Sequence, residues 1–409
     1  SITGAAGAGL ALSGDNRGNN YLIGPNTVLQ NNLYPVSVGN AGLLPGSVIP
    51  ATGNVHNYIP WTAGAQVDSR GPVIWAPVAV PYAIESDFPH VVGLMTILPG
   101  VDVKIGADVG FVVDAGTLVA RGLPGLPITF ERLNPAQPWA FIGIQTFGDR
   151  VEHCLLDGSN YGLSAAGSLL NVESCTFRNN YIASQANGFG ALVVHGTQFT
   201  NNNTGILQLD ASISLNGHTN PNAFAGNTLA VDIASPFGSL NVDARENWWN
   251  SPSGPQAPDN PGGTGDPVGG LADAVHTVPF RTAPPNFNDA PPVVLLQRHS
   301  DLAEPGHKII VTWDAQDDAA IVEQRILFSP ALDLSFPVTV ADHLPPGQRS
   351  FEWTVPDIGF QVSGVLAYLR VVAVDNIGQE GWDEAALTIP TTDLAGTPTI
   401  TTNFSGTYQ

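Results

Sequence analysis

Apolar and polar residues in the middle of the chain recur at a regular interval. The repeated segments are Cys154-Leu-Leu-Asp-Gly-Ser, Cys175-Thr-Phe-Arg-Asn-Asn and Thr197-Gln-Phe-Thr-Asn-Asn, which begin 21 and then 22 positions apart. A repeat of this length is typical of solenoids, in which stacked turns bury one continuous core. The pattern therefore predicts a coil and does not predict a globular pocket.

Two kinds of residue recur at fixed places in these repeats. One place holds Leu156, Phe177 and Phe199, and another holds Ser159, Asn180 and Asn202. Because equivalent residues lie above one another in stacked turns, we expect an aromatic stack in the core and an asparagine ladder beside it. Asn202-Asn-Thr is also a formal N-glycosylation acceptor, but its place in the ladder favours a structural role.

The coil extends on both sides of these repeats. Residues 94–105 and 110–120 alternate between apolar and polar or small side chains, which is the period of β-strands. Phe224 continues the repeat, and Asn247-Trp-Trp ends it, since adjacent tryptophans can cover the apolar interior of a last turn. We expect the Pro/Gly-rich run 256–270 to be irregular and Asp266 to be a turn residue.

Residues 290–390 have a different pattern. Alternating apolar strands are predicted at Ile309–Asp314, Gln324–Ser329, Ser350–Pro356 and Ala367–Asp375, at the spacing of a β-sandwich. Trp313 and Trp353 are the expected core aromatics. The run from Ala283 to Pro292, with its two Pro-Pro pairs, is typical of a stiff linker.

Several motifs together resemble bacterial extracellular right-handed parallel β-helix proteins of the pectate-lyase-like superfamily. They are Pro81-Tyr-Ala-Ile, Gly116-Thr-Leu-Val-Ala, Pro127-Ile-Thr-Phe, the repeated Phe-x-Asn-Asn turns, Asn247-Trp-Trp, Ser253-Gly-Pro and Asn260-Pro-Gly-Gly-Thr-Gly-Asp. The resemblance covers residues 70–285, and the C-terminal strands resemble a fibronectin type III or immunoglobulin-like module. It implies an all-β chain: a right-handed parallel β-helix followed by an antiparallel β-sandwich.

This resemblance implies a division of the chain into five parts. The expected parts are N-terminal partial coils (1–70), a β-helix with a Trp-Trp cap (71–282), a Pro-rich linker (283–290), a sandwich module (291–390) and a Thr-rich tail (391–409). The tail is a candidate strand for assembly with a neighbouring molecule, because added strands bind through main-chain hydrogen bonds.

Composition and charge exclude some kinds of binding partner. Of 409 residues, 43% are hydrophobic and 12% charged, and the 45 Gly and 34 Pro favour strands and turns over helices. The formal net charge is -21, with lysine only at positions 104 and 308. Nucleic acid is not an expected partner, because binding a phosphate backbone needs clustered cations, and no apolar run is long enough for membrane insertion.

The cysteines and the N-terminus are relevant to the cellular location of the protein. Cys154 and Cys175 lie one turn apart, so either a disulfide bridge or two buried free thiols fit the pattern. The chain begins with Ser1 and has a single methionine, Met95, as a processed mature protein would. We therefore expect a secreted, extracellular or cell-surface protein.

A glycan-cleaving site is one hypothesis that the β-helix pattern raises. Glycosidases need carboxylates that converge on one face, and Asp157 and Asp210 form the best pair in this sequence. Asp157, however, aligns with Arg178 and Thr200 at a turn, and Asp210 falls elsewhere on its turn. No catalytic residue is therefore predicted, nor any cofactor-binding residue.

Cation binding is a second hypothesis. Asp314, Asp317 and Asp318 crowd one predicted loop of the sandwich, and Asp375 and Asp383 follow on later strands that could approach it. Hard cations such as calcium need several such oxygens. The predicted candidate ligands are Asp314, Asp317, Asp318 and Asp375, with a solvated acidic loop as the alternative.

These observations favour a secreted, non-catalytic structural or adhesive protein. Both ends of a β-helix present unpaired backbone groups, so end-to-end contact would produce a homo-oligomeric filament or surface layer. The alternative is an extracellular polysaccharide-binding or polysaccharide-degrading β-helix protein. Aromatic side chains and carboxylates gathered on one helix face would favour that alternative.

Overall fold

The computed structural model describes most of the chain. The described residues are 2–13, 20–49, 52–62, 66–68, 72–218, 220–235, 241–287, 291–296, 305–317, 319–329, 336–356 and 365–389. They divide into two compact units, 1–290 and 291–409. Each unit has its own hydrophobic core.

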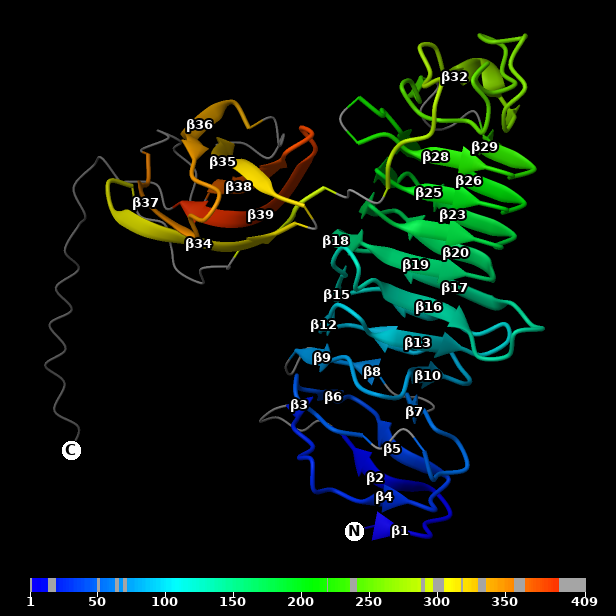
Figure 1. The fold of residues 1–409 in the computed structure, drawn as a ribbon, viewed down its shortest axis with the longest axis vertical. Coiled ribbons are helices and arrows are strands. Elements are labelled where there is room, and N and C mark those ends of the chain that lie inside the picture. The colour runs from blue at the N-terminus through cyan, green and yellow to red at the C-terminus, as the bar shows by residue number, and fades with distance from the viewer. Residues whose placement is uncertain are drawn as a thin grey trace, which may run out of the picture. The chain divides into compact units, whose positions relative to one another are not determined.

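The first unit is a solenoid of parallel strands, and its turns stack in chain order (Figure 1). Each complete turn contributes one strand to each of three sheets. Sheet I has eight strands: β7 (Ile59–Pro60), β10 (Tyr82–Ile84), β13 (Asp102–Ile105), β16 (Ile128–Arg132), β19 (Cys154–Asp157), β22 (Thr176–Arg178), β25 (Gln198–Thr200) and β28 (Ala223–Ala225).

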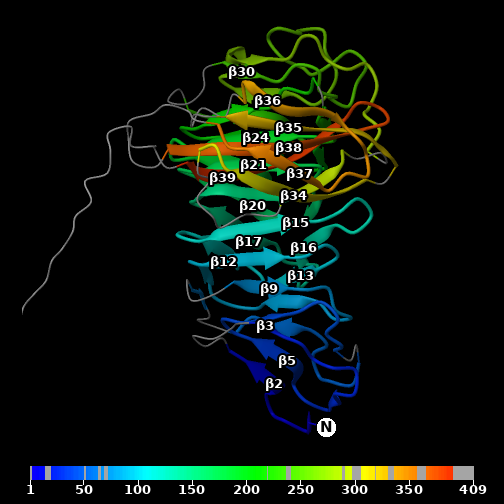
Figure 2. The ribbon, with the colours of Figure 1, turned by 90° about the vertical axis from the view of Figure 1, so that its left-hand side faces the viewer.

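Sheets II and III have nine strands each. Sheet II contains β8 (Gln66–Val67), β11 (His90–Val91), β14 (Phe111–Val113), β17 (Trp139–Ile144), β20 (Ser159–Ala166), β23 (Ile182–Asn187), β26 (Thr204–Gln208), β29 (Leu229–Ile233) and β31 (Val268–Gly270). Sheet III, several of whose strands are labelled in Figure 2, contains β3 (Asn20–Tyr21), β6 (Gly42–Leu43), β9 (Val73–Trp75), β12 (Leu94–Ile97), β15 (Thr117–Arg121), β18 (Phe147–Glu152), β21 (Leu169–Glu173), β24 (Ala191–His195) and β27 (Ser212–Ser214).

Shorter parallel pairs complete both ends of the solenoid. They are β1 (Ile2–Thr3) with β4 (Leu29–Gln30), β2 (Ala8–Leu12) with β5 (Tyr34–Val38), and β30 (Val242–Asp243) with β32 (Val275–His276). The one helical element among the described residues is a single 3-10 turn, η1 (Ala272–Ala274). The run 256–270 was expected to be irregular, but its last residues form β31 and pair with β29.

The predicted aromatic stack lies in the solenoid core. Phe177, Phe199 and Phe224 are Cα partners in sheet I, and their ring centroids are 5.1 and 5.0 Å apart with nearly parallel planes. Trp249 extends the stack at 4.7 Å from Phe224 and is fully buried. Trp249 therefore continues the aromatic stack, whereas Trp248 is half-buried. The core cluster also includes Ala257, Val268 and Val275, which follow it in the chain, and the tryptophan cap stays a prediction.

The predicted asparagine ladder is also confirmed. The Ser159 N–H donates to the Asn180 side-chain oxygen at 2.8 Å, the Asn180 N–H to Asn202 at 3.0 Å, and the Asn202 N–H to Asn227 at 3.0 Å. Asp266 is the last acceptor, at 2.7 Å from the Asn227 N–H. Asn202 is 2% exposed, so its side chain serves this ladder and is not available for glycosylation in the folded chain.

The second unit consists of antiparallel sheets. One sheet pairs β33 (Val293–Leu296), β34 (Lys308–Gln316) and β37 (Ser350–Thr354); the other pairs β36 (Val338–Leu344), β35 (Ile321–Ser329), β38 (Val365–Asp375) and β39 (Glu380–Ile389). Trp313 and Trp353 are both buried in its core, as expected. The predicted fold class, an all-β chain with a parallel β-helix followed by antiparallel sheets, is confirmed.

Candidate functional site

Exposed aromatic side chains gather on neighbouring turns where the strands of sheet II begin. Phe88 precedes β11, Phe141 lies in β17, Tyr161 lies in β20 and Tyr181 directly precedes β23. Phe88, Tyr161 and Tyr181 are 38, 40 and 59% exposed, and Phe141 is half-buried. We call these side chains the aromatic strip, because β17, β20 and β23 lie one above another in the solenoid (Figure 1).

The register of sheet II aligns Phe141 with Tyr161 and places Tyr181 one residue out of line with them. Phe141 and Tyr161 are Cα partners, and Tyr181 precedes Ile182, the partner of Tyr161 in the next turn. Adjacent parallel strands lie about 4.8 Å apart, so the backbones of β17, β20 and β23 follow one another along the solenoid axis in steps of that size.

Phe88 reaches Phe141 across an intervening turn, with ring centroids 5.4 Å apart. The turn between them carries Gly110, at which a Cβ atom would lie only 1.9 Å from the Phe141 carbonyl oxygen. A glycine is therefore required there, and no side chain of that residue separates the two phenyl rings.

Hydrogen-bonding groups flank the aromatic strip. The Asn160 side-chain amide donates to Asp108 Oδ1 at 3.1 Å, a contact between residues 52 positions apart in sequence. Asp87, next to Phe88, is exposed, as is Asp108. Exposed rings beside amide and carboxylate groups are the chemistry with which proteins bind sugars, because the rings pack on C–H faces and the polar groups bind hydroxyls.

The proposed carboxylate pair is not brought together. Asp157 ends β19 in sheet I, where Arg178 Nε lies 2.7 Å from one carboxylate oxygen and Arg132 lies 3.4 Å from the other. Asp210 follows β26 of sheet II and accepts a hydrogen bond from the Ser235 hydroxyl. Each carboxylate thus has its own partners on a different sheet, which is not the convergent arrangement that glycoside hydrolysis needs.

A buried charge network that the sequence analysis did not predict lies on sheet III. Glu152 and Glu173 are Cα partners on β18 and β21. Arg121 Nε lies 2.6 Å from Glu152, which also pairs with Arg150, and the Asn220 amide donates to Glu173 at 3.1 Å. Burial, and then the neighbouring charge of Glu152, raise the pKa of Glu173 to about 7.

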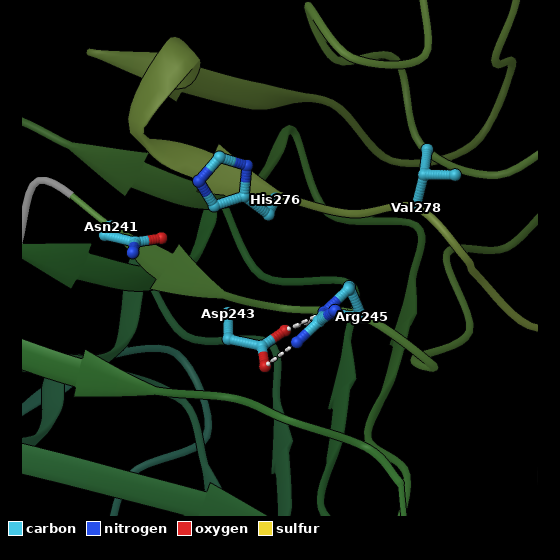
Figure 3. Close-up of a pocket in the computed structure, with 5 residues that line it drawn as sticks. All are labelled: Asn241, Asp243, Arg245, His276 and Val278. Carbon is cyan, nitrogen blue, oxygen red and sulfur yellow. Dashed lines mark hydrogen bonds and ion pairs between the residues drawn. The ribbon is translucent and has the colours of Figure 1, made fainter.

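A cavity of about 420 Å³ opens at the C-terminal end of the solenoid (Figure 3). Its lining residues are Asn241, Asp243, Arg245, His276 and Val278. Figure 3 shows the Arg245 guanidinium facing the Asp243 carboxylate, with nitrogen to oxygen distances of 2.7 and 2.8 Å.

The Asp243 carboxylate is held in its ionised form. The hydrogen bonds from Arg245 lower the pKa of Asp243 to about 2. A carboxyl group with so low a pKa is ionised at neutral pH and is a poor proton donor. This pocket therefore presents a fixed ion pair and not a general acid.

The predicted calcium ligands lie in several local environments. Asp314 Oδ1 lies 3.3 Å from Arg349 Nε, and Asp317 accepts the Ala319 N–H at 3.2 Å. Asp375 is Cα partner of Ile321 and accepts the N–H groups of its own turn, from Ile377 at 2.9 Å and Gln379 at 2.8 Å.

The calcium site stays a prediction. Asp318 lies outside the described residues. Among the described part of the chain, Asp314, Asp317 and Asp375 do not present oxygens that all lie within 4.8 Å of one another. Asp383 instead accepts the Leu296 N–H at 2.8 Å.

The two cysteines are buried free thiols in this structure. The Cys154 N–H donates to Cys175 Sγ at 3.4 Å, and the Cys175 N–H donates to Thr197 Oγ1 at 3.3 Å. The ladder continues from the Thr197 N–H to Asn222 at 3.0 Å. These side chains therefore form a second ladder in the solenoid, and burial raises the pKa of the Cys154 thiol.

Within the described residues, no helix has the length and apolar character needed to cross a bilayer. The chain matches no protein-family model, no curated protein and no solved structure.

Proposed function

We propose that this protein is a non-catalytic adhesive protein whose β-helix binds an extended neutral polysaccharide along the aromatic strip. The observation that carries the proposal is the exposure of Phe88, Tyr161 and Tyr181 on neighbouring turns, with Phe141 between them. Exposed apolar surface of this kind, rimmed by polar groups, is typical of a binding site.

The direction of the strip favours a polymer over a small ligand. The rings follow one another along the solenoid axis, one or two turns apart. A single sugar would cover one ring, whereas an extended chain would contact several, and each further contact adds affinity because the second is intramolecular. Rigid strands hold the rings in place before binding, which reduces the entropy that binding costs.

Charge favours a neutral glycan over an acidic one. Asp87 and Asp108 lie beside the strip, and the formal net charge of the chain is -21. The arginines Arg132 and Arg178 are engaged by Asp157 on sheet I. A polyuronate would meet repulsion at the strip, while neutral hydroxyls can donate to both carboxylates.

Binding can be tested by affinity electrophoresis against neutral glucans, mannan and xylan, with polygalacturonate as the acidic comparison. We expect retardation by at least one neutral polymer. The double substitution Tyr161→Ala with Tyr181→Ala should weaken binding about tenfold or more, since each aromatic contact contributes about 0.5–1.5 kcal/mol. Phe189→Ala is the matched control, because Phe189 is 82% exposed but lies beyond the opposite end of β23.

Two outcomes would contradict this proposal. Equal retardation of the double variant and the wild type would exclude the strip as the binding surface. Release of new reducing ends or unsaturated sugars from a bound polymer would favour the degrading alternative over an adhesive role.

Self-assembly, an extracellular location and the fibronectin type III or immunoglobulin-like class of the second unit stay part of the proposal. The two antiparallel sheets with a common core support the sandwich class.

The tail proposed for assembly, 391–409, lies outside the described residues. Electron microscopy of the full chain and of a chain that ends at residue 390 would test assembly, and identical filaments from both would contradict a role for the tail.

A further inference from the structure

An irregularity in the second unit brings three potential metal ligands together. In the β35–β36 pair, Gln324 lies opposite Leu344, whereas Ile326 lies opposite Ala341. Two steps along β35 thus match three steps along β36, so β36 carries one extra residue. His343 in this bulge has a left-handed backbone, with φ of 51°. A bulge of this kind re-aims side chains that would otherwise alternate between faces.

The side chains at this bulge are Glu323, Asp342 and His343. His343 Nδ1 lies 3.2 Å from Glu323 Oε2, and His343 Nε2 lies 3.9 Å from Asp342 Oδ2. One ligand atom from each residue falls within 4.8 Å of the others. Ligands at about 2.0–2.2 Å from a tetrahedral zinc ion are about 3.4 Å apart, so the exposed side chains would have to rotate until both carboxylates face one nitrogen of His343.

The surroundings leave this cluster open to a cation. The side chains of His343, Asp342 and Glu323 are 80, 50 and 32% exposed, so an ion and its water can reach them. Arg325, the next outward residue on β35, is engaged by Glu380 at 2.7 Å. Two carboxylates beside one imidazole therefore carry a local negative charge that a divalent cation would neutralise.

We propose that Glu323, Asp342 and His343 bind one zinc-class divalent transition-metal ion, with water as the remaining ligand. Imidazole nitrogen favours zinc and its neighbours in the first transition row, whereas calcium takes oxygen ligands. This site shares no residue with the calcium ligands predicted from the sequence. It also lies in a different unit from the aromatic strip and does not depend on polysaccharide binding.

The proposal can be tested by titrating the full, untagged chain with zinc in a calorimeter and with cobalt in a spectrophotometer. We expect one ion per chain. His343→Asn should weaken zinc binding at least about tenfold, and asparagine tolerates the left-handed backbone at this position. Glu323→Gln should also weaken binding, which tests the cluster with a variant outside the bulge. Calcium at equal concentration should not compete.

His218→Ala is the matched control. His218 Nδ1 also lies 3.2 Å from a carboxylate oxygen, that of Glu246, but no third ligand joins the pair in the described residues. Its substitution should leave zinc binding unchanged. No binding by the wild-type chain, or equal binding by the wild type and the folded His343→Asn variant, would overturn the proposal.

Discussion

At the scale of single residues, Glu173 departs from ordinary acid-base behaviour in the range near neutral pH. Its pKa is raised from 4.5 to about 7, first by burial and then by Glu152 on the neighbouring strand. Like charges directly opposite one another in a sheet are destabilising. The arginines on β15 and β18 offset part of this cost through ion pairs with Glu152.

This shift predicts how the stability of the solenoid depends on pH. Below pH 4.5 the folded and unfolded chains both hold the Glu173 proton, and between pH 4.5 and about 7 the folded chain holds more of it. The contribution of Glu173 to the free energy of unfolding should therefore be fully present below pH 4.5 and be lost as pH rises through about 7. Glu173→Gln should remove that loss, on the order of 1–3 kcal/mol between pH 5 and 8.

Thermal unfolding of the wild type and Glu173→Gln across this range provides the measurement. Other groups also titrate, so the quantity of interest is the difference between the two proteins as pH changes. A constant difference at every pH would contradict the raised pKa. Glu131→Gln is a suitable comparison, because Glu131 pairs with Lys104 at 2.6 Å on the partly exposed face of sheet I.

At the scale of single elements, the ladders set the register between turns. Asn202 accepts the Asn180 N–H, and its own amide donates to the carbonyl oxygen of Phe177 at 3.1 Å. One side chain thus satisfies two buried backbone groups of the preceding turn. Buried groups left without partners cost more than the net gain from a typical hydrogen bond.

Asn202→Ala should therefore destabilise the solenoid by about 2–4 kcal/mol, because it leaves buried donors and acceptors unpaired. Asn203→Ala is the matched control, since Asn203 is the adjacent residue and is exposed. Chemical denaturation followed by circular dichroism would measure both variants. Equal stability of the two variants would show that the ladder contributes little.

The sequence predicts the asparagine ladder wherever the turns have similar lengths. Asn180, Asn202 and Asn227 are separated by 22 and 25 positions, so their equivalence can be read from the numbering. Asp266 lies 39 positions after Asn227, and the long excursion between them hides its place as the last member.

The aromatic strip could not be predicted from the sequence, because the turns that carry it differ in length. Tyr82 and Val103 are partners 21 positions apart, but Val103 and Phe130 are partners 27 positions apart. With turns of unequal length, the alignment of Phe88 with Phe141 requires the backbone. The bulge that brings Asp342 and His343 together with Glu323 is likewise a feature of strand pairing. The hydrophobic pattern of the sequence does not predict it.

At the scale of the whole molecule, the chain has two independent cores. The buried side chains of residues 1–290 form one cluster, and those of residues 291–409 form another. Cooperative unfolding follows the extent of a shared core, and multi-domain chains commonly depart from a single transition.

Calorimetry of the full chain should therefore show two unfolding transitions. Asn202→Ala should lower the first unit's transition alone, and Trp353→Phe the second unit's transition alone, because Trp353 packs on Phe328 within the second core. A single transition shifted equally by both substitutions would mean that the units unfold together.

The asparagine ladder has a chemical direction, and that direction bears on how the solenoid can grow. Each asparagine amide donates to the next residue of the ladder, as in Asn202 to Asn227 at 2.9 Å and Asn227 to Asp266 at 2.8 Å. Both carboxylate oxygens of Asp266 accept hydrogen bonds and its side chain has no amide N–H to donate, so Asp266 ends the series. Gene duplication could therefore add turns before Asp266 and keep the side-chain bonds of the ladder, whereas a turn added after it would begin without a side-chain donor.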